Sequence, residues 1–195
     1  MFVNFKLYIK CILGATNFSF INSHAQSAKN DSVLLDPKAL YLLILHFRFS
    51  SLFYSTQLVD IFSYELPQTN LVLQATNKGV SVVSVYNFHV LGTQNRFFIF
   101  SQANSTVLDG TYLLRTTNSL SSITELFSAA NWLERECAEL HGVSFSGKKD
   151  LRNLMLQYGD SSSPFQKSFP TVGLKEMYYN PIKDTIVQNP VTLQI

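Results

Sequence analysis

The residues whose types could do chemistry are concentrated between positions 131 and 152 of a chain that is otherwise poor in charge. Ionised side chains end one predicted helix, and a glycine and a short basic segment follow. The group comprises Glu134, Arg135, Glu136, Glu139, Gly142, Lys148, Lys149, Asp150 and Arg152. Two of its carboxylates, Glu134 and Glu139, fall on adjacent helical turns, which would let one act as a general acid and the other as a general base. One interpretation is therefore a small stand-alone acid/base enzyme.

The same charges also suit a docking surface for another protein. Arg135 and Glu139 are four residues apart, and an exposed pair at this spacing contributes only about 0.3–0.5 kcal/mol. Covered by a partner, such charges become decisive, because removing one of them then costs about 3–5 kcal/mol. A solvated helix face is the simplest explanation of the pattern. The choice among these interpretations depends on the rest of the sequence.

No other motif for catalysis, a cofactor or a metal occurs in the sequence. The histidines lack the spacing of metal ligands: they are His24, His46, His89 and His141. There is no glycine-rich phosphate loop and no Gly-x-Ser-x-Gly elbow. We therefore expect this chain to bind no metal and no cofactor. His141 is expected at a surface or interface, with its charged form favoured by the dipole of the helix it ends.

Basic residues beside an aromatic one raise a third possibility, a small RNA-binding module. Lys148, Lys149 and Arg152 follow Phe145 closely. Three charges make a small electrostatic footprint, and the acidic helix beside them would repel phosphate. The formal net charge of the whole chain is only +2. We therefore expect no nucleic-acid partner.

The charged cluster is positioned by a helix predicted over Ile123–His141. Ser122 and Glu125 have the spacing of a capping box, in which each side chain binds a free backbone N–H of the first turn. Gly142 suits the left-handed position that closes a helix. Apolar residues recur on one face of this helix, with Glu134 near the edge of their stripe. They are Ile123, Leu126, Phe127, Ala130, Leu133, Cys137 and Leu140.

The segments before this helix predict an α+β fold, a two-layer mixed sheet with flanking helices. Asp36-Pro37 begins a helix that runs to about Arg48, with the aspartate as cap and the proline in the first turn. Hydrophobic alternation predicts the strands, and a turn at 92–95 predicts a hairpin. The predicted strands are residues 58–62, 71–74, 80–88, 96–101 and 112–115.

Three regions are expected along the chain. Residues 1–35 predict a poorly structured N-terminal extension, and the few lysines and lack of acids in residues 1–30 make only a weak targeting segment. Residues 36–142 form the α+β core domain. Residues 143–195, interrupted by four prolines, predict an extended C-terminal arm, which must be ordered by something it lies on.

The composition favours a subunit surrounded by partners over a free monomer. Charged residues make up 14% of the 195-residue chain and aromatic residues 13%, with sixteen Phe. That is more apolar surface than one small domain needs to hide. The two cysteines form no disulfide or metal framework, and no apolar run approaches the roughly 20 residues needed to cross a bilayer. Abundant Phe, Tyr, Asn and Ile also suit an AT-rich organellar genome.

The spacing of the charged cluster resembles the signature of a known family. Glu134-Arg-Glu136, Gly142 and Asp150-Leu-Arg-Asn-Leu-Met155 are similar to the signature of the small peripheral-arm subunit of respiratory complex I, called NADH dehydrogenase subunit nine when mitochondrially encoded. Tyr158-Gly159 and Phe169-Pro170 continue the similarity. The resemblance is strong from about residue 122 to the end. It marks a divergent member, because Ala138, His141, Lys149 and Tyr178 replace the family's usual residues.

The resemblance implies a core subunit of NADH:ubiquinone oxidoreductase on the matrix side of the mitochondrial inner membrane. Such a complex passes electrons from NADH through FMN and iron–sulfur clusters to ubiquinone and couples this to proton translocation. The member subunit carries no redox centre, so its role is structural. Its implied partners are other complex I subunits, chiefly the hydrogenase-like subunit that builds the quinone pocket. The implied contact residues are Glu134, Arg135, Glu136, Glu139, Gly142, Lys148, Asp150, Arg152, Phe169 and Pro170.

Overall fold

The structure is a computed structural model of the chain. It describes residues 9, 11–12, 18–20, 30–51, 53, 55–66, 81–92, 95–107, 114–116, 119–159 and 162–192. The predicted strand at 71–74 lies outside these residues.

The body of the molecule is a mixed six-stranded sheet. Its strands lie in the order β1-β2-β5-β4-β3, and β6 pairs with β5. Only the pairing of β2 with β5 is parallel, and the neighbouring pairs are antiparallel. The strands are β1 (Phe18–Phe20), β2 (Asn30–Leu35), β3 (Thr56–Glu65), β4 (Ser81–Val90), β5 (Asn95–Val107) and β6 (Leu114–Thr116). The predicted α+β class with a mixed sheet is confirmed.

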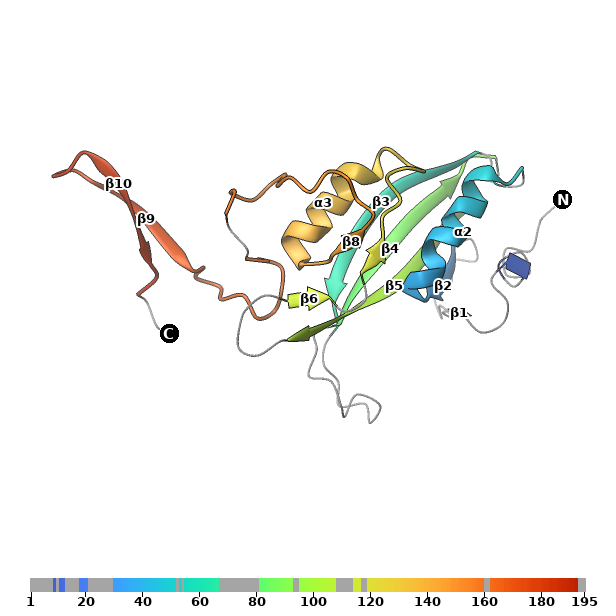
Figure 1. The fold of residues 1–195 in the computed structure, drawn as a ribbon, viewed down its shortest axis with the longest axis horizontal. Coiled ribbons are helices and arrows are strands. Elements are labelled where there is room, and N and C mark those ends of the chain that lie inside the picture. The colour runs from blue at the N-terminus through green and yellow to red at the C-terminus, as the bar shows by residue number, and fades with distance from the viewer. Residues whose placement is uncertain are drawn as a thin grey trace.

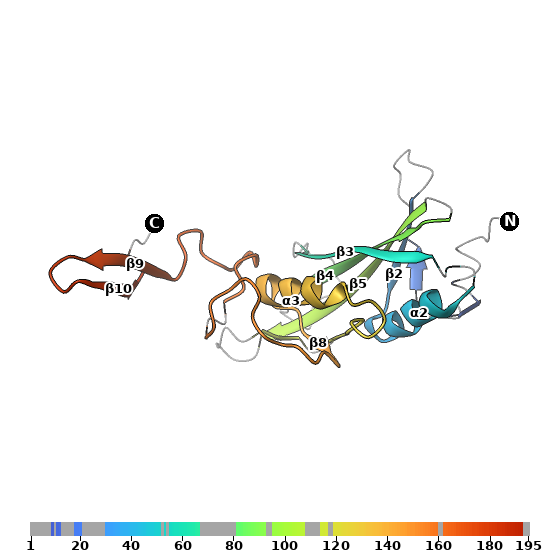
Figure 2. The ribbon, with the colours of Figure 1, turned by 90° about the horizontal axis from the view of Figure 1, so that it is seen from above.

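Two helices cover one face of this sheet, as both views show (Figures 1 and 2). Helix α2 (Pro37–Phe49) begins as predicted, because the Asp36 carboxylate accepts a hydrogen bond from the Lys38 N–H at 3.3 Å. Helix α3 (Ala130–His141) packs chiefly against β3. The core between the two layers is aromatic, with Phe47, Phe88 and Phe97 in ring contact.

The predicted poorly structured extension is wrong for residues 30–35. Strand β2 lies inside the sheet between β1 and β5, and its Val33 is fully buried. The pairing with β5 joins residues more than 60 positions apart, so no local pattern announces it. Val33 and Leu35 therefore belong to the core domain, which was predicted to start only at residue 36.

The predicted boundary at residue 142 is also not a structural boundary. Strand β7 (Leu120–Ser121) pairs in parallel with β8 (Phe145–Ser146), on either side of α3. Val143 and Phe145 belong to the hydrophobic core. The body therefore extends past Gly142 to at least Phe145, because two buried side chains hold the chain there.

The last element that the structure describes is a hairpin that projects from the body. Strands β9 (Lys175–Asn180) and β10 (Thr185–Pro190) pair antiparallel, and Figure 1 shows them at the end of the molecule away from the helices and sheet. Nine of the twelve residues of the two strands are exposed, and none is buried. Within the described residues, neither helix has the length and apolar character that a membrane span requires.

Candidate subunit-docking site at the root of the C-terminal arm

Helix α3 is shorter than predicted. It begins at Ala130, and the segment 123–129 forms hydrogen-bonded turns in place of two helical turns. The expected capping box is absent, because the Glu125 carboxylate pairs instead with Lys149 on the surface at 3.2 Å. The end of the helix is as predicted: Gly142 adopts φ 71° and its N–H donates to the Ala138 carbonyl at 3.0 Å.

Glu134 explains why the turn before α3 does not continue the helix. Its carboxylate is completely buried and accepts hydrogen bonds from the Ser122 hydroxyl at 2.7 Å and the Ile123 N–H at 2.8 Å. A capping box would have used the hydroxyl and the backbone N–H of Ser122, but the hydroxyl donates to Glu134 and the N–H donates to the Ser146 carbonyl at 2.9 Å. The carboxylate on the helix thus fixes the chain that enters it, so Glu134 faces the interior of the body.

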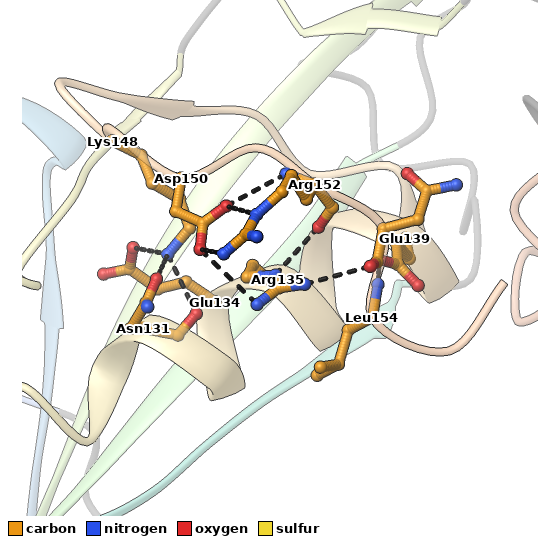
Figure 3. Close-up of polar contacts among 9 residues, drawn as sticks. Asn131, Glu134, Arg135, Glu139, Lys148, Asp150, Arg152 and Leu154 are labelled. Carbon is orange, nitrogen blue, oxygen red and sulfur yellow. Dashed lines mark hydrogen bonds and ion pairs between the residues drawn. The ribbon is translucent and has the colours of Figure 1, made fainter. Parts of the chain in front are cut away.

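A buried ammonium neutralises this carboxylate. Lys148 Nζ lies 3.1 Å from Glu134 Oε2, and the two side chains are only 2% and 0% exposed. The same Nζ donates to the Asn131 carbonyl at 3.0 Å and to its side-chain oxygen at 3.2 Å (Figure 3). Every proton of the ammonium therefore has an acceptor. A buried pair this completely bonded is stable, whereas either charge alone would be costly.

Arg135 holds the loop that follows Lys148. Its Nε donates to the Arg152 carbonyl at 2.8 Å, and one terminal nitrogen donates to the Asn153 carbonyl at 2.9 Å. The other terminal nitrogen lies 3.6 Å from the Asp150 carboxylate. Because the guanidinium has its donors in a fixed fork, these contacts set both the position and the direction of the loop backbone.

Asp150 and Arg152 form a second, exposed pair at the edge of this loop. The Arg152 guanidinium binds the Asp150 carboxylate through two bonds, of 2.9 and 3.0 Å. These hydrogen bonds, followed by that from the Arg152 N–H, hold the pKa of Asp150 far below its ordinary value. Asp150 therefore keeps its charge in mild acid and remains available to Arg135.

Glu139 completes the attachment of the loop. Its carboxylate accepts the backbone N–H groups of Leu154, Met155 and Leu156. Burial by itself raises the pKa of Glu139, but these three donors and the charge of Arg135 outweigh it, so that the pKa lies below its ordinary value. Arg135 and Glu139 thus bind the 150–156 loop from one helix face, the first through its carbonyls and the second through its amides.

The loop exposes apolar side chains while its polar backbone is held. We call residues 148–158 the root loop. Leu151, Met155 and Tyr158 are 73%, 59% and 71% exposed. Because the backbone of the loop is already fixed, little backbone entropy is lost when a partner covers these side chains. The root loop therefore has the character of a preformed binding surface.

A second attachment follows at residues 163–167. The Phe165 N–H donates to the Leu140 carbonyl at 3.0 Å, and Gln166 Nε2 donates to the His141 carbonyl at 3.0 Å. The Lys167 N–H donates to the Glu65 carboxylate of β3 at 2.7 Å. The end of α3 and the edge strand of the sheet therefore both hold the start of the arm.

The expectation that His141 favours its charged form is wrong. Burial lowers the pKa of His141 and outweighs the opposing effect of Glu65. Its Nδ1 is buried without a hydrogen-bond partner, and its ring meets the Phe165 ring edge-on at 5.4 Å. Desolvation thus prevails over the helix dipole at this position.

Three sequence-predicted residues lie apart from these contacts. Glu136 is half-buried on another face of α3. Phe169 is half-buried and Pro170 is exposed, and both take part only in local turns, in which Phe169 donates to Gln166 and Gly173 donates to Pro170. Sequence reasoning missed Ser122, Asn131 and Glu65, whose side chains complete the site. The sequence predicted Ser122 only as a helix cap, and it gave no role to Asn131 or Glu65. The partners of these three side chains can be recognised only in the fold.

The geometry does not favour the acid/base interpretation of Glu134 and Glu139. The first carboxylate is enclosed and paired, and the second is occupied by three backbone donors. Among the described residues, no cluster of three or more His, Cys, Asp or Glu side chains could hold a metal ion. Lys148 faces the interior, so it cannot contribute to a surface for RNA. What this arrangement can do is hold a loop rigidly.

Comparison with known proteins gives this site a context. A family model described as "Respiratory-chain NADH dehydrogenase, 30 Kd subunit" matches residues 36–175, which include α3, the root loop and the start of β9. The chain belongs to this family. The description names the 30 Kd subunit, which corrects the designation subunit nine that the signature residues had suggested.

Curated relatives of the 30 Kd subunit family align over a shorter stretch. An NADH-quinone oxidoreductase subunit of Ralstonia pickettii is 41% identical over 75 residues, which is 38% of each chain. The mitochondrial NADH dehydrogenase [ubiquinone] iron-sulfur protein 3 of Candida albicans is 43% identical over 90 residues, 46% of this chain and 32% of that protein. The alignments thus span less than two-fifths of the length of these relatives.

A solved structure shares the fold across most of the chain. It is that of the membrane-bound sulfane sulfur reductase, an archaeal respiratory membrane complex, with a TM-score of 0.61 and 86% of both chains covered. Only 13% of the aligned residues are identical, so this likeness concerns the fold alone.

Proposed function

We propose that this chain is a mitochondrially encoded 30 Kd subunit in the peripheral arm of NADH:ubiquinone oxidoreductase, on the matrix side of the inner membrane. In this role it carries no redox centre of its own. It supports the passage of electrons from NADH to ubiquinone, coupled to proton translocation, by holding other subunits in place. Membership of the family, the mitochondrial relative and the organellar composition support this proposal.

The observation that carries the proposal is the contrast between backbone and side chains in the root loop. Its backbone is bound to α3 through Arg135 and Glu139, while Leu151, Met155 and Tyr158 point into solvent. A monomer gains nothing from displaying these side chains on a fixed loop, whereas a subunit gains a binding surface that is ready before assembly.

The arm beyond the root loop would then lie on a neighbouring subunit. We propose the hydrogenase-like subunit that builds the quinone pocket as this neighbour. The hairpin β9–β10 supports the idea, because Met177, Tyr179 and Ile186 are 68%, 58% and 76% exposed. A two-stranded hairpin is at best marginally stable in water, so it requires a surface to lie on.

Replacement of Arg135 tests this function. In Arg135→Ala, the amount of assembled complex should fall severalfold on a native gel, while NADH:ubiquinone turnover per assembled complex stays near wild type. The reason is that the guanidinium holds the root loop and contacts no reacting group. Lys149→Ala is the matched control, because its side chain is 86% exposed in a surface pair and its loss should leave assembly intact. Normal assembly of Arg135→Ala with a specific loss of turnover would contradict a structural role.

A further inference from the structure

A shallow pocket outside the root loop lies where the end of α2, the start of β3 and the turn before α3 meet. Its volume is about 310 Å³, and no carboxylate among the described residues lines it. Its wall contains polar and aromatic residues and also Ala129, which directly precedes α3. The polar and aromatic residues are Arg48, Thr56, Gln57, Phe127 and Ser128.

The N-terminus of α3 lies at this pocket without a side-chain cap or an acid in its first turn, and its first two N–H groups, of Ala130 and Asn131, donate to the Phe127 and Ser128 carbonyls of the preceding turn. The cap position is Ala129, which makes no side-chain hydrogen bond to the helix, and the first turn contains no acid. A twelve-residue helix carries a partial positive charge at this end. Ser128 and Ala129, which precede the helix, form part of the pocket wall. An anion in the pocket would therefore meet the positive end of α3.

Thr56 independently indicates a missing ligand. The residue is 4% exposed, and its Oγ1 is buried without a hydrogen-bond partner. Leaving a buried hydroxyl unsatisfied costs about 1–3 kcal/mol, so such groups are normally bonded. Because Thr56 lines the pocket, a rotation about its χ1 would bring the enclosed hydroxyl to an acceptor held there.

Arg48 supplies a full positive charge to the same place. Its guanidinium carbon lies 5.5 Å from the centre of the Phe127 ring, so the aromatic ring holds the cation at the wall of the pocket. No carboxylate in the described part of the chain lies within ion-pair distance of Arg48. Stacking on a ring leaves the edge N–H groups of a guanidinium free to donate.

We propose that this pocket binds a phosphate group. Guanidinium, hydroxyl and a helix N-terminus are the donors that phosphate sites combine, and here they converge where no acid competes. The inference goes beyond the proposed function and does not depend on it. The phosphate belongs either to a soluble ligand or to a phospholipid headgroup.

Amide hydrogen exchange of the full chain tests the site, with inorganic phosphate as the probe and chloride at matched ionic strength as the reference. At a phosphate concentration about nine times its dissociation constant, exchange in residues 128–133 should slow by about tenfold. Arg48→Gln and Thr56→Val should each abolish most of this effect. Thr56→Val removes an unpartnered hydroxyl, so the variant should fold at least as well as the wild type.

Two further variants make the result specific. Ala129→Asp places a carboxylate at the cap, and it should slow exchange without phosphate and remove the response to it. Arg96→Gln removes an exposed cation elsewhere and should respond like the wild type. An equal response in the wild type, Arg48→Gln and Thr56→Val would overturn the proposal, as would no response in the wild type.

Sedimentation with vesicles identifies the source of the phosphate. Vesicles of phosphatidylcholine alone are compared with vesicles that also contain phosphatidic acid. Binding that requires both phosphatidic acid and Arg48 supports a lipid headgroup, and a phosphate response without vesicle binding supports a soluble ligand. The proposal would be overturned if Arg48→Gln bound vesicles as the wild type does and phosphate did not slow amide exchange in the wild type.

Discussion

The root loop and the β9–β10 hairpin both expose apolar side chains, but they are held in different ways. The root loop is bound through its backbone to Arg135 and Glu139 of α3, and it leaves the body beside a fully buried ion pair. The hairpin consists of two strands that pair only with each other, and none of their residues is buried. In the proposed function, the difference means that the first contact is prepared in advance and the second is ordered by the partner.

Removal of the buried Glu134 carboxylate should have the largest effect on the attachment of the root loop. In Glu134→Ala, Lys148 becomes an unpaired buried cation, and the Ser122 hydroxyl and Ile123 N–H lose their acceptor. The free energy of unfolding, measured by urea denaturation of the full chain, should fall by about 3–5 kcal/mol. Glu136→Ala, on the same helix but half-buried, should change it by less than about 0.5 kcal/mol.

A double replacement separates loss of the charge pair from loss of packing. Glu134→Leu combined with Lys148→Met should recover much of the stability lost in Glu134→Ala, because no charge is then left unpaired. If Glu134→Ala cost less than about 1 kcal/mol, the buried pair would not be what holds the start of the root loop.

Acid should release the root loop before it affects the hairpin. The pKa of Glu139 is lower in the folded chain than its usual value of 4.5. Its contribution is therefore complete above that value and is lost as pH falls through the lower folded pKa. Amide exchange of residues 154–156, corrected for intrinsic rates, should accelerate over this window, while that of 185–190 should not.

The same attachment can be weakened at neutral pH. Glu139→Gln replaces charged hydrogen bonds by neutral ones and should cost about 2 kcal/mol. It should also remove the acid dependence of exchange in residues 154–156. An unchanged acid dependence in this variant would assign the titration to another group.

Gly142 offers a smaller test of the second attachment. An added Cβ would lie 2.8 Å from Gln166 Nε2 and 3.0 Å from Ser163 Oγ, at a backbone φ of 71°. Gly142→Ala should therefore lower the free energy of unfolding by about 1–2 kcal/mol and loosen residues 163–166. Gly159 has a similar φ of 84° with nothing within 4 Å, so Gly159→Ala measures the backbone strain alone. Equal effects of the two changes would mean that the Gln166 contact contributes nothing.

The hairpin should show the smallest effect on stability. Ile186 is 76% exposed, so Ile186→Ser should shift the free energy of unfolding by less than about 0.5 kcal/mol. Its effect should instead appear as a lower yield of assembled complex. Ile99 is fully buried, and Ile99→Ser should destabilise the body severely. If Ile99→Ser reduced the yield of assembled complex and Ile186→Ser did not, the hairpin would have no role in assembly.

Local signals predicted those features whose causes are local. The Asp36 cap, the start of α2 and the left-handed Gly142 follow from single residues and their neighbours. Strands β4 and β5 were readable from their β-branched and aromatic residues, although β4 is buried on both faces at 82–86. The charged residues between 131 and 152 could be recognised as one group, because they are close together in sequence.

The remaining features depend on partners that are distant in sequence. The capping box fails because Glu134, twelve residues later, takes the Ser122 hydroxyl and the Ser146 carbonyl takes the Ser122 N–H. Strand β2 gains its place from β5, far along the chain. The burial of Glu134 could not be inferred, because only the fold shows that Lys148 and Asn131 reach the same point.

The position of Lys148 has a consequence for synthesis. During translation, the sheet, α2 and α3 leave the ribosome before this lysine does, so a nascent chain that ends between Glu134 and Lys148 contains the carboxylate without its counter-ion. The body cannot settle into its final packing until the fourteen residues after Glu134 have emerged. Completion of the fold is thereby timed to the arrival of the segment from which the arm departs.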